Sequence, residues 1–267
     1  MSLDIVVCVK QVPDPQQFSK ITLDPVRQTI KREGIPAVIN PLDRHAVEEA
    51  LRLREKYSGK VTAISMGPPQ ATEVLQDALA MGVDDAVLLS DRAFAGADTL
   101  ATVYPLAAAI KKIGKFDLII CGNESVDGAT QQVGPQLAEL LGIPHVTYVN
   151  KIDDIAEGCM GLQRAIEQGC LKISLQLPAL ITVVKEINEF RLPSVMAIME
   201  ATSKEIKIWN NGDIEVEKDK IGLDGSPTTV AGVFQQKSDR KKNILVGDTP
   251  EEVARRAVQE LRKLGVV

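Results

Sequence analysis

The sequence predicts an α/β protein with a doubly wound, Rossmann-like parallel sheet of the adenine-nucleotide-binding type, an added hairpin, and an extended C-terminal arm that ends in a helix. Up to about residue 150, short apolar runs alternate with longer segments of helical periodicity, which is typical of a parallel sheet with crossover helices. The runs are apolar almost throughout, as expected of strands covered on both faces. At 267 residues and 45% apolar, the chain is large enough to bury such a core.

In chain order, the first strands are predicted at residues 5–9, 61–65, 86–89, 118–121 and 146–149. The helix before the second strand begins with Asn40 as its cap and Pro41 at its first position. Three further helical patterns end at a glycine, where a left-handed residue closes a helix: Gly82, Gly114 and Gly142. Strand and helix signals therefore agree on a doubly wound order.

The pattern changes after residue 150. Residues 160–176 predict two strands about a turn near Gly169, and residues 179–184 predict a further buried strand. Residues 186–248 contain no long periodic segment, so we expect an arm that lies on another chain. Thr249 as cap and Pro250 at the first position then open a terminal helix.

Composition disfavours several classes of protein. Lys and Arg number 31 against 36 Asp and Glu, a net charge of −5 with no long basic run, which argues against nucleic-acid binding. No apolar run approaches the roughly 18 residues that cross a bilayer, and the start does not resemble a secretory signal, so we expect a cytoplasmic protein without membrane insertion. The four cysteines form no CxxC pair, which disfavours a metal site, and Cys8 and Cys121 are expected to be buried, reduced thiols.

Ligands of an open parallel sheet bind at the carboxyl ends of its strands. The most unusual segment there is 122–134, a small-residue loop that leads from the fourth predicted strand into a helix. Its amides and the helix N-terminus suit a phosphate or pyrophosphate. Glu124 and Asp127 would repel phosphate, so we expect them to accept hydrogen bonds from ribose hydroxyls or base nitrogens, or to face solvent. An ordinary polar loop remains the alternative at this point.

Catalysis by the chain's own side chains is not predicted. The sequence contains no GxGxxG, no P-loop and no GxSxG elbow. The two histidines, His45 and His145, stand in positions that are more often structural than catalytic. Any redox chemistry must therefore be supplied by a bound cofactor.

Seven motifs occur in order along the chain: CVKQVPD (8–14), NPLD (40–43), SMGP (65–68), ALAMGVD (78–84), GNESVDGATQQVG (122–134), LPALITV (177–183) and RLPSVM (191–196). Together they strongly resemble the β subunit of electron transfer flavoproteins. That resemblance implies a nucleotide-binding α/β fold and a heterodimer with a larger α subunit that carries the electron-transferring FAD. It divides this chain into a nucleotide-binding domain (1–185), a partner-contacting recognition loop and arm (186–248), and a C-terminal helix (249–267).

The family's own nucleotide site maps onto the strand ends picked out above. The resemblance implies that it is formed by the end of the first strand, the NP turn, the turn after the second strand and the loop after the fourth. In this sequence the implied cofactor-binding residues are Cys8, Asn40, Pro41, Leu42, Asp43, Met66, Gly122, Asn123, Glu124, Ser125, Val126, Asp127, Gly128, Ala129, Thr130, Gln131, Gln132 and Val133.

The family divides by the ligand of this site. Housekeeping members hold AMP structurally, whereas electron-bifurcating members hold a second FAD, take two electrons from NADH and send them singly to a high-potential and a low-potential acceptor. ESVDG (124–128), residues 94–110 and SPTT (226–229) resemble the bifurcating type. The cofactors so implied are FAD and NAD, with Asp98 and Thr99 near the flavin or NAD. Two alternatives are a non-bifurcating β subunit with AMP and, from another class, a universal-stress-type adenine-nucleotide sensor.

The resemblance also implies partners. These are the α subunit, a flavin dehydrogenase of the acyl-CoA or lactate type, and ferredoxin as low-potential acceptor. Leu192 matches the hydrophobic anchor of the family's recognition loop, which docks on the dehydrogenase, and apolar neighbours adjoin it at Pro193, Val195, Met196 and Met199. The loop 122–134 contains no cation to stabilise a reduced flavin, so we expect that charge from Arg164, from an arginine of the partner chain or from a helix end.

Overall fold

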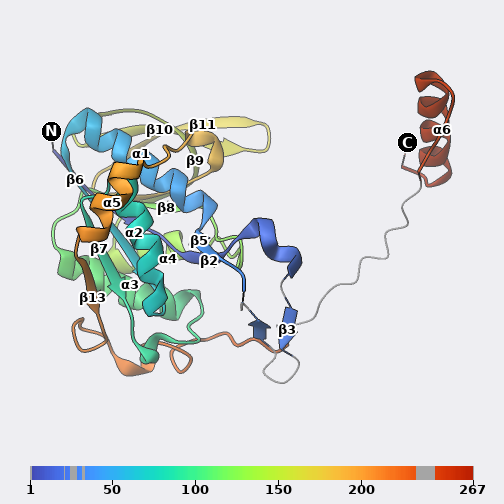
Figure 1. Ribbon diagram of the computed structural model, residues 1–267. Coiled ribbons are helices and arrows are strands. Elements are labelled where there is room, and N and C mark those ends of the chain that lie inside the picture. Colours follow the sequence, from blue (N-terminus) through green and yellow to red (C-terminus); the bar gives the residue numbers. More distant parts are fainter. Residues whose placement is uncertain (1, 21, 25–28, 32–33, 233–243, 267) are drawn as a thin grey trace. The chain divides into compact units, whose positions relative to one another are not determined.

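The structure is a computed structural model that describes residues 2–20, 22–24, 29–31, 34–232 and 244–266 (Figure 1). The chain forms two compact units, Met1–Ala231 and Gly232–Val267, and each is described by itself. No helix within the described ranges is both long and apolar enough to cross a membrane.

The larger unit is built on one mostly parallel sheet of nine strands in the order β11-β10-β9-β12-β8-β1-β6-β7-β13. Every neighbouring pair from β9 to β13 is parallel, and only β9–β10 and β10–β11 are antiparallel. The strands are β1 (Leu3–Cys8), β6 (Gly59–Met66), β7 (Asp85–Leu89), β8 (Leu118–Gly122), β9 (His145–Ala156), β10 (Cys159–Ile166), β11 (Gly169–Gln176), β12 (Ala179–Val183) and β13 (Ile206–Trp209). The predicted parallel sheet and added hairpin are confirmed.

Helices cover both faces of this sheet, because its strands are apolar on both sides. One core packs under α1 (Pro41–Tyr57), α2 (Thr72–Met81) and α5 (Val195–Ser203). The other packs under α3 (Thr99–Ile113) and α4 (Val133–Leu141). This doubly wound arrangement is the one predicted from the alternating pattern.

Two short antiparallel pairs precede the main run of helices. They join β2 (Gln11–Pro13) to β5 (Ala37–Ile39) and β3 (Thr22–Asp24) to β4 (Thr29–Lys31). The first pair brings the end of β5 beside the segment that follows β1. It therefore places the start of α1 next to the carboxyl end of β1.

The structure adds two elements that the sequence pattern does not predict. Residues 186–231 are not extended throughout: α5 packs on α2, and β13 pairs with β7 at one edge of the sheet. In β13 only Ile206 and Trp209 are half-buried, so its four residues show no clear period. Strand β9 is also longer than its predicted core of residues 146–149, since its second half pairs with β10.

Helix ends follow the predicted punctuation. Gly82 and Gly142 close α2 and α4 with positive φ angles of 120° and 68°. Gly114 also has a positive φ, 107°, after α3. Asn40 occupies the N-cap of α1 and Pro41 its first turn, but the Asn40 side chain makes no capping hydrogen bond. It bonds instead to Asp43 and to the loop after β8.

The smaller unit contains α6 (Pro250–Lys263). The Thr249 hydroxyl accepts a hydrogen bond from the N–H of Glu252 at 3.3 Å, which confirms the predicted cap. No residue of α6 is buried, and Val258, Leu261 and Leu264 are exposed along the helix and just after it. An amphipathic helix of this kind gains most of its stability by packing its apolar side on another surface.

Candidate functional site

The chain order of the strands reverses between β1 and β8. From β1 the chain proceeds to β6 and β7 on one side, and then returns to place β8 on the other side of β1. A parallel sheet opens a crevice at the carboxyl ends of its strands at such a point, and ligands bind there. The loop that follows β8 begins at this edge and leads into α4. The loop predicted to bind a nucleotide therefore lies at the switch point.

Asn40 joins this loop to the start of α1. Its side-chain oxygen accepts the N–H of Val126 at 3.0 Å, and its amide nitrogen donates to the carbonyl of Glu124 at 2.8 Å. The same nitrogen donates to Asp43 Oδ1 at 3.0 Å. Asn40 is fully buried, so these bonds are shielded from water. The two separate motifs NPLD and GNESVDG thus form one structure.

Asp43 is the buried carboxyl beneath this junction. Its Oδ2 accepts the N–H of Lys10 at 2.8 Å. The main chain of Gly122 passes so close that a Cβ there would stand 2.3 Å from Asp43 Oδ1, which only glycine avoids. Burial raises the pKa of Asp43 to about 7, although hydrogen bonds from Asn40, Lys10 and Gly122 act in the opposite sense.

The two ends of the loop are attached to β12. Asn123 donates its N–H to the carbonyl of Val183, and its side-chain oxygen accepts the hydroxyl of Thr182 at 2.8 Å. At the other end, a Cβ on Gly134 would lie 2.4 Å from Thr182 Cγ2, so α4 packs on β12 only because residue 134 is glycine. The loop is therefore fixed at both ends and at Val126.

Polar contacts also organise the loop between those points. Lys10 Nζ lies 2.7 Å from Asp127 Oδ1 and 3.2 Å from the hydroxyl oxygen of Ser125. Gln131 donates its side-chain amide to Glu124 Oε2 at 2.7 Å. Both acidic side chains of the loop thus have partners within the protein. Lys10 was not predictable as a site residue, because its contact with Asp127 joins two residues that are 117 positions apart in the sequence.

Main-chain groups of the loop remain open to a ligand. Among the residues that the structure describes, the N–H groups of Gly128, Thr130 and Gln131 have no acceptor. Ala129 and Gln131 have positive φ angles of 47° and 60°, an uncommon conformation that turns successive amides to one side and forms anion-binding concavities. These amides and the start of α4 fit a phosphate group.

Cys8 and Met66 lie at the same edge, on the side of the sheet that α3 and α4 cover. Cys8 ends β1 and is paired in register with Cys121 of β8. Cys121 is buried and Cys8 is half-buried, and both thiols are reduced. A hydrogen bond with Cys8, together with burial, raises the pKa of the Cys121 thiol. A protonated, buried thiol is a packing group, so the prediction holds for Cys121, whereas Cys8 is less buried than predicted.

Thr99 is brought into contact with the loop, whereas Asp98 is engaged elsewhere. The Thr99 hydroxyl donates to Gln132 Oε1 at 2.9 Å. Asp98 caps α3 through the N–H of Ala101, and its Oδ2 accepts the N–H and the hydroxyl of Thr228 at 3.1 and 2.8 Å. The Asp98 carboxylate therefore holds the SPTT segment against the start of α3.

Four buried side-chain atoms have no hydrogen-bond partner in the described parts of the chain. They belong to Ser65, Gln136, Asn150 and Arg164. Ser65 is near the end of β6 and Gln136 is in the first turns of α4, while Arg164 is paired with Val149, level with the end of β12. Buried polar atoms normally have partners, so unpartnered ones at the carboxyl edge fit a site completed by a ligand or another chain.

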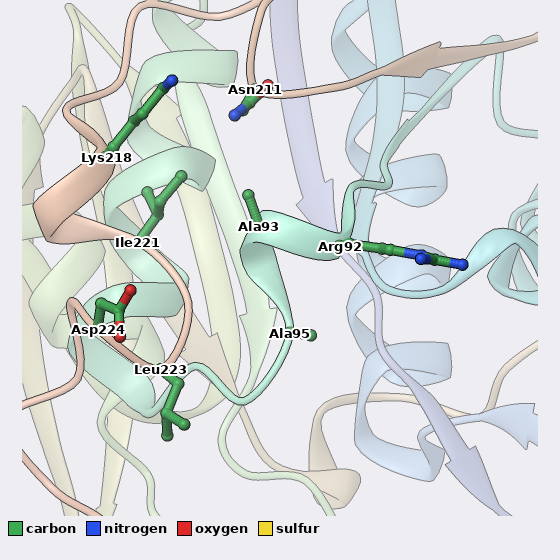
Figure 2. A pocket seen from close by; sticks show the side chains of 8 residues that line it. All are labelled: Arg92, Ala93, Ala95, Asn211, Lys218, Ile221, Leu223 and Asp224. Atoms are coloured by element: carbon green, nitrogen blue, oxygen red, sulfur yellow. The ribbon is translucent and has the colours of Figure 1, made fainter.

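A separate pocket of about 420 Å³ lies beside the turn after β7 (Figure 2). Arg92, Ala93 and Ala95 form one side, and residues between Asn211 and Asp224 form the other. The loop after β8 contributes no lining residue. This pocket is therefore separate from the candidate site at the loop after β8.

An apolar surface patch stands at the start of α5, away from any core. Four apolar side chains form it, and all are largely exposed to solvent: Leu192 (82% exposed), Val195, Met196 and Met199. Exposed single apolar residues are ordinary, but a cluster of four on one short segment is typical of a contact surface. We call these four residues the docking patch.

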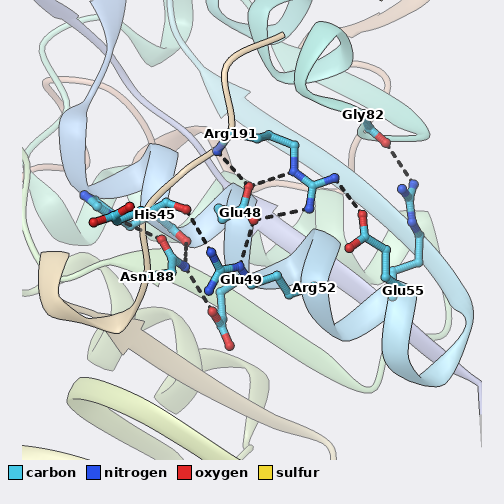
Figure 3. Close-up of polar contacts among 10 residues, drawn as sticks. His45, Glu48, Glu49, Arg52, Glu55, Gly82, Asn188 and Arg191 are labelled. Carbon is cyan, nitrogen blue, oxygen red and sulfur yellow. Dashed lines mark hydrogen bonds and ion pairs between the residues drawn. The ribbon is translucent and has the colours of Figure 1, made fainter.

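An ion pair between the half-buried Arg191 and the buried carboxylate of Glu48 attaches the segment that carries the docking patch to α1 (Figure 3). Arg191 donates from Nε to Glu48 Oε2 at 2.8 Å and from Nη1 to Glu55 Oε1 at 2.6 Å, and its N–H also donates to Glu48. The Glu48 side chain is only 4% exposed and also accepts from Arg52. Residue 191 is therefore fixed on both main chain and side chain, immediately before Leu192.

The two histidines, His45 and His145, differ in their surroundings. His45 lies 3.0 Å from the side-chain oxygen of Asn188 and meets the edge of the Phe190 ring. This contact adds to the attachment of residues 188–191 to α1. His145 starts β9 and is exposed.

Comparison with known proteins identifies the family. The model of the electron transfer flavoprotein domain matches residues 28–214, which is more than half of the chain. The chain belongs to the electron transfer flavoprotein family. It is 48% identical over 94% of its length to the electron transfer flavoprotein subunit beta of Thermoanaerobacterium thermosaccharolyticum, and covers 95% of that protein. Identity to the subunit beta of Clostridium acetobutylicum is 50%, over 85% of this chain and 86% of that one.

A third relative is the caffeyl-CoA reductase-Etf complex subunit CarD of Acetobacterium woodii, at 44% identity over 98% of this chain and 99% of that one. The chain is therefore similar to β subunits along nearly its whole length. Membership of the β-subunit family implies an α-subunit partner and a flavin or adenine nucleotide as ligand.

Proposed function

We propose that the chain binds FAD and NAD(H), pairs with an α subunit, and takes part in electron bifurcation from NADH. The electrons would divide between a partner flavin dehydrogenase and a low-potential acceptor such as ferredoxin. Bound FAD would supply the redox chemistry. The chain's residues would hold it, with the adenosine diphosphate moiety on the amides of residues 122–133.

The observation that carries this proposal is the hydrogen bond between Thr99 and Gln132. It joins residues 94–110, which resemble the bifurcating type, to the nucleotide loop. Asp98 next to Thr99 also binds Thr228 in SPTT, the other segment with that resemblance. Two of the segments that the resemblance separates from AMP-binding members, 94–110 and 226–229, are thus in contact, and Thr99 joins them to the loop that contains the third, ESVDG.

The α subunit is the proposed partner for surfaces that this chain leaves exposed. Within the smaller unit, α6 presents Val258, Leu261 and Leu264 without a described partner. In the larger unit, Ile166 and Leu171 are exposed on the hairpin of β10 and β11. Apolar patches of this kind are covered in stable heterodimers.

The docking patch is the proposed contact for the flavin dehydrogenase. Of the acyl-CoA and lactate types, we favour an enzyme that acts on a CoA ester, because one relative is named as a subunit of a caffeyl-CoA reductase-Etf complex. Leu192 would insert into an apolar depression of that enzyme, with Arg191 holding its main chain in place.

Counting cofactors tests the proposal. The chain should be co-expressed with its α subunit, and FAD and AMP released from the purified heterodimer should be quantified by chromatography. Two FAD per heterodimer, with bleaching of flavin absorbance by NADH, support bifurcation. One FAD with one AMP would instead establish the non-bifurcating alternative, in which the same loop holds AMP.

The sensor alternative predicts a different result. A free-standing adenine-nucleotide sensor would bind nucleotide without an α subunit and would contain no FAD. Membership of the β-subunit family and the exposed apolar surfaces both favour a subunit of a larger complex over such a sensor.

A further inference from the structure

The nucleotide loop has an unfavourable charge for its ligand. Residues 123–132 include Glu124 and Asp127 but neither lysine nor arginine. A phosphate that binds the open amides of Gly128 and Thr130 therefore enters a loop that carries two carboxylates and no cation of its own. Like charges in one site oppose binding.

Lys10 supplies the missing positive charge from another part of the chain. It lies two residues after the end of β1, at the switch point. Its N–H donates to Asp43 Oδ2, and its carbonyl accepts the N–H of Asn40, both at bonding distance. The main chain of Lys10 is thus fixed by the two residues that also anchor the loop.

The side chain of Lys10 then reaches across the loop. Its ammonium lies 2.7 Å from Asp127 Oδ1 and 3.2 Å from Ser125 Oγ. The Asp127 side chain is only 13% exposed, whereas that of Lys10 is 48% exposed. The aspartate is the shielded member of the pair, so its interaction with the Lys10 ammonium is screened less by water than that of a fully exposed pair.

The second carboxylate of the loop, Glu124, has a neutral hydrogen-bond donor as its described partner. Glu124 accepts a neutral amide hydrogen bond from Gln131, which itself accepts the hydroxyl of Tyr148. This arrangement fixes Glu124 without cancelling its charge. Among the described contacts, the ion pair of Lys10 with Asp127 therefore brings a positive charge to the loop.

We propose that Lys10 is a positioning residue of the nucleotide site, which neutralises Asp127 and so allows the loop amides to bind the phosphate groups of an adenine nucleotide. This inference rests on the proposed function, because it needs a nucleotide at residues 122–133. Lys10 acts on the ligand through Asp127 and the loop. Its effect should therefore depend on the charge of the ligand and on the presence of the Asp127 carboxylate.

Binding of three probes to the heterodimer tests this assignment. Adenosine, AMP and ADP should be titrated calorimetrically into heterodimer stripped of its nucleotide. For Lys10→Met we expect affinity for ADP to fall about tenfold, or about 1.4 kcal/mol, while affinity for adenosine changes less than about twofold. Lys10→Arg keeps the charge and should bind ADP nearly as wild type does.

Two further variants complete the design. Asp127→Asn in the Lys10→Met background should restore most of the affinity for ADP, because no carboxylate then needs neutralising. Lys60→Met is the matched control, since Lys60 pairs with Asp85 near the opposite ends of the strands, and it should leave binding unchanged.

Three results would overturn the inference. Equal losses for adenosine and ADP would mean that Lys10 only shapes the loop. Failure of Asp127→Asn to restore binding would mean that Lys10 contacts the phosphate itself, and unchanged binding by Lys10→Met would give it no role. If the wild-type heterodimer bound none of the probes, the proposed function would fail instead, which keeps the two failures distinct.

Discussion

The side-chain oxygen of Asn40 accepts the main-chain N–H of Val126 at 3.0 Å, across 86 residues of sequence. A residue at the N-cap of a helix normally bonds to the first turn of that helix. Here the same side chain crosses to the nucleotide loop and binds it twice, through Val126 and Glu124. The start of α1 thereby becomes one wall of the site.

Asn40→Ala should loosen the loop. It leaves the N–H of Val126, the carbonyl of Glu124 and a buried carboxylate oxygen without their partner, and each unsatisfied buried group costs about 1–3 kcal/mol. We expect amide exchange of residues 124–128 in the heterodimer to accelerate at least about tenfold by mass spectrometry. Asn211→Ala is the control, since only the main chain of Asn211 makes a described hydrogen bond. Equal exchange rates in both variants would refute the role of Asn40.

Asp43 should make stability depend on pH. Its pKa is raised from 3.8 to about 7, so the folded chain binds this proton more tightly than the unfolded chain. That contribution is fully present below about pH 4 and is lost as pH rises towards 7, an effect of up to about 4 kcal/mol. The melting temperature of wild type relative to Asp43→Asn should therefore fall between pH 4.5 and 7.5. A constant or rising difference would contradict the assignment.

Gly122→Ala should disrupt the junction of loop and helix. The added Cβ would stand 2.3 Å from Asp43 Oδ1 and 2.9 Å from the carbonyl carbon of Leu42, so main chain must move. We expect a loss of about 2 kcal/mol or more in stability, and nucleotide-free heterodimer after purification. In Gly232→Ala the Cβ meets no atom within 4 Å, and this control should retain its nucleotide. Normal nucleotide content in Gly122→Ala would argue against the site.

Arg191→Met should destabilise the segment that carries the docking patch. It removes the hydrogen bonds of Arg191 to Glu48, whose side chain is 4% exposed, and to Glu55. Glu48 keeps its contact with Arg52, so the loss is that of hydrogen bonds to a charged group, each of which contributes about 1.5–3 kcal/mol. Thermal unfolding of the heterodimer should show this loss of stability. Arg52→Met removes the more exposed of the two partners of Glu48, so its loss of stability should be smaller. The reverse order would contradict the geometry.

Leu192→Ala should weaken docking without affecting the fold. Its side chain is 82% exposed, so stability should change by less than about 0.5 kcal/mol. We expect the KM for the partner dehydrogenase to rise about tenfold, while FAD content and reduction by NADH remain normal. Ile208→Ala, an exposed residue on β13, serves as the control. An unchanged KM would remove Leu192 from the interface.

The sequence predicts the central strands of the sheet better than its short edge strand. Strands β1, β6, β7 and β8 were predictable because burial on both faces makes them continuously apolar. Strand β13 was not, since a short edge strand with two exposed residues has no period, and only its pairing with β7 makes it a strand.

The same limit applies to the site. Positions at strand ends follow from topology, so the loop after β8 and the start of α1 could be selected from sequence. Lys10 could not, because an ion pair between residues 117 apart has no local signature. Asn40 was predicted at a helix cap, but the choice of its hydrogen-bond partner depends on where the loop lies. Predicted roles for the individual cofactor-binding residues remain predictions.

The most direct test of the nucleotide site is amide exchange of the stripped heterodimer with and without added FAD, followed by mass spectrometry. Bound nucleotide should protect residues 122–133, whose main-chain N–H groups at positions 128, 130 and 131 have no acceptor within the described chain. Protection should also reach residues 40–43 through Asn40. Protection confined to other regions, with residues 122–133 exchanging at their original rates, would contradict the account.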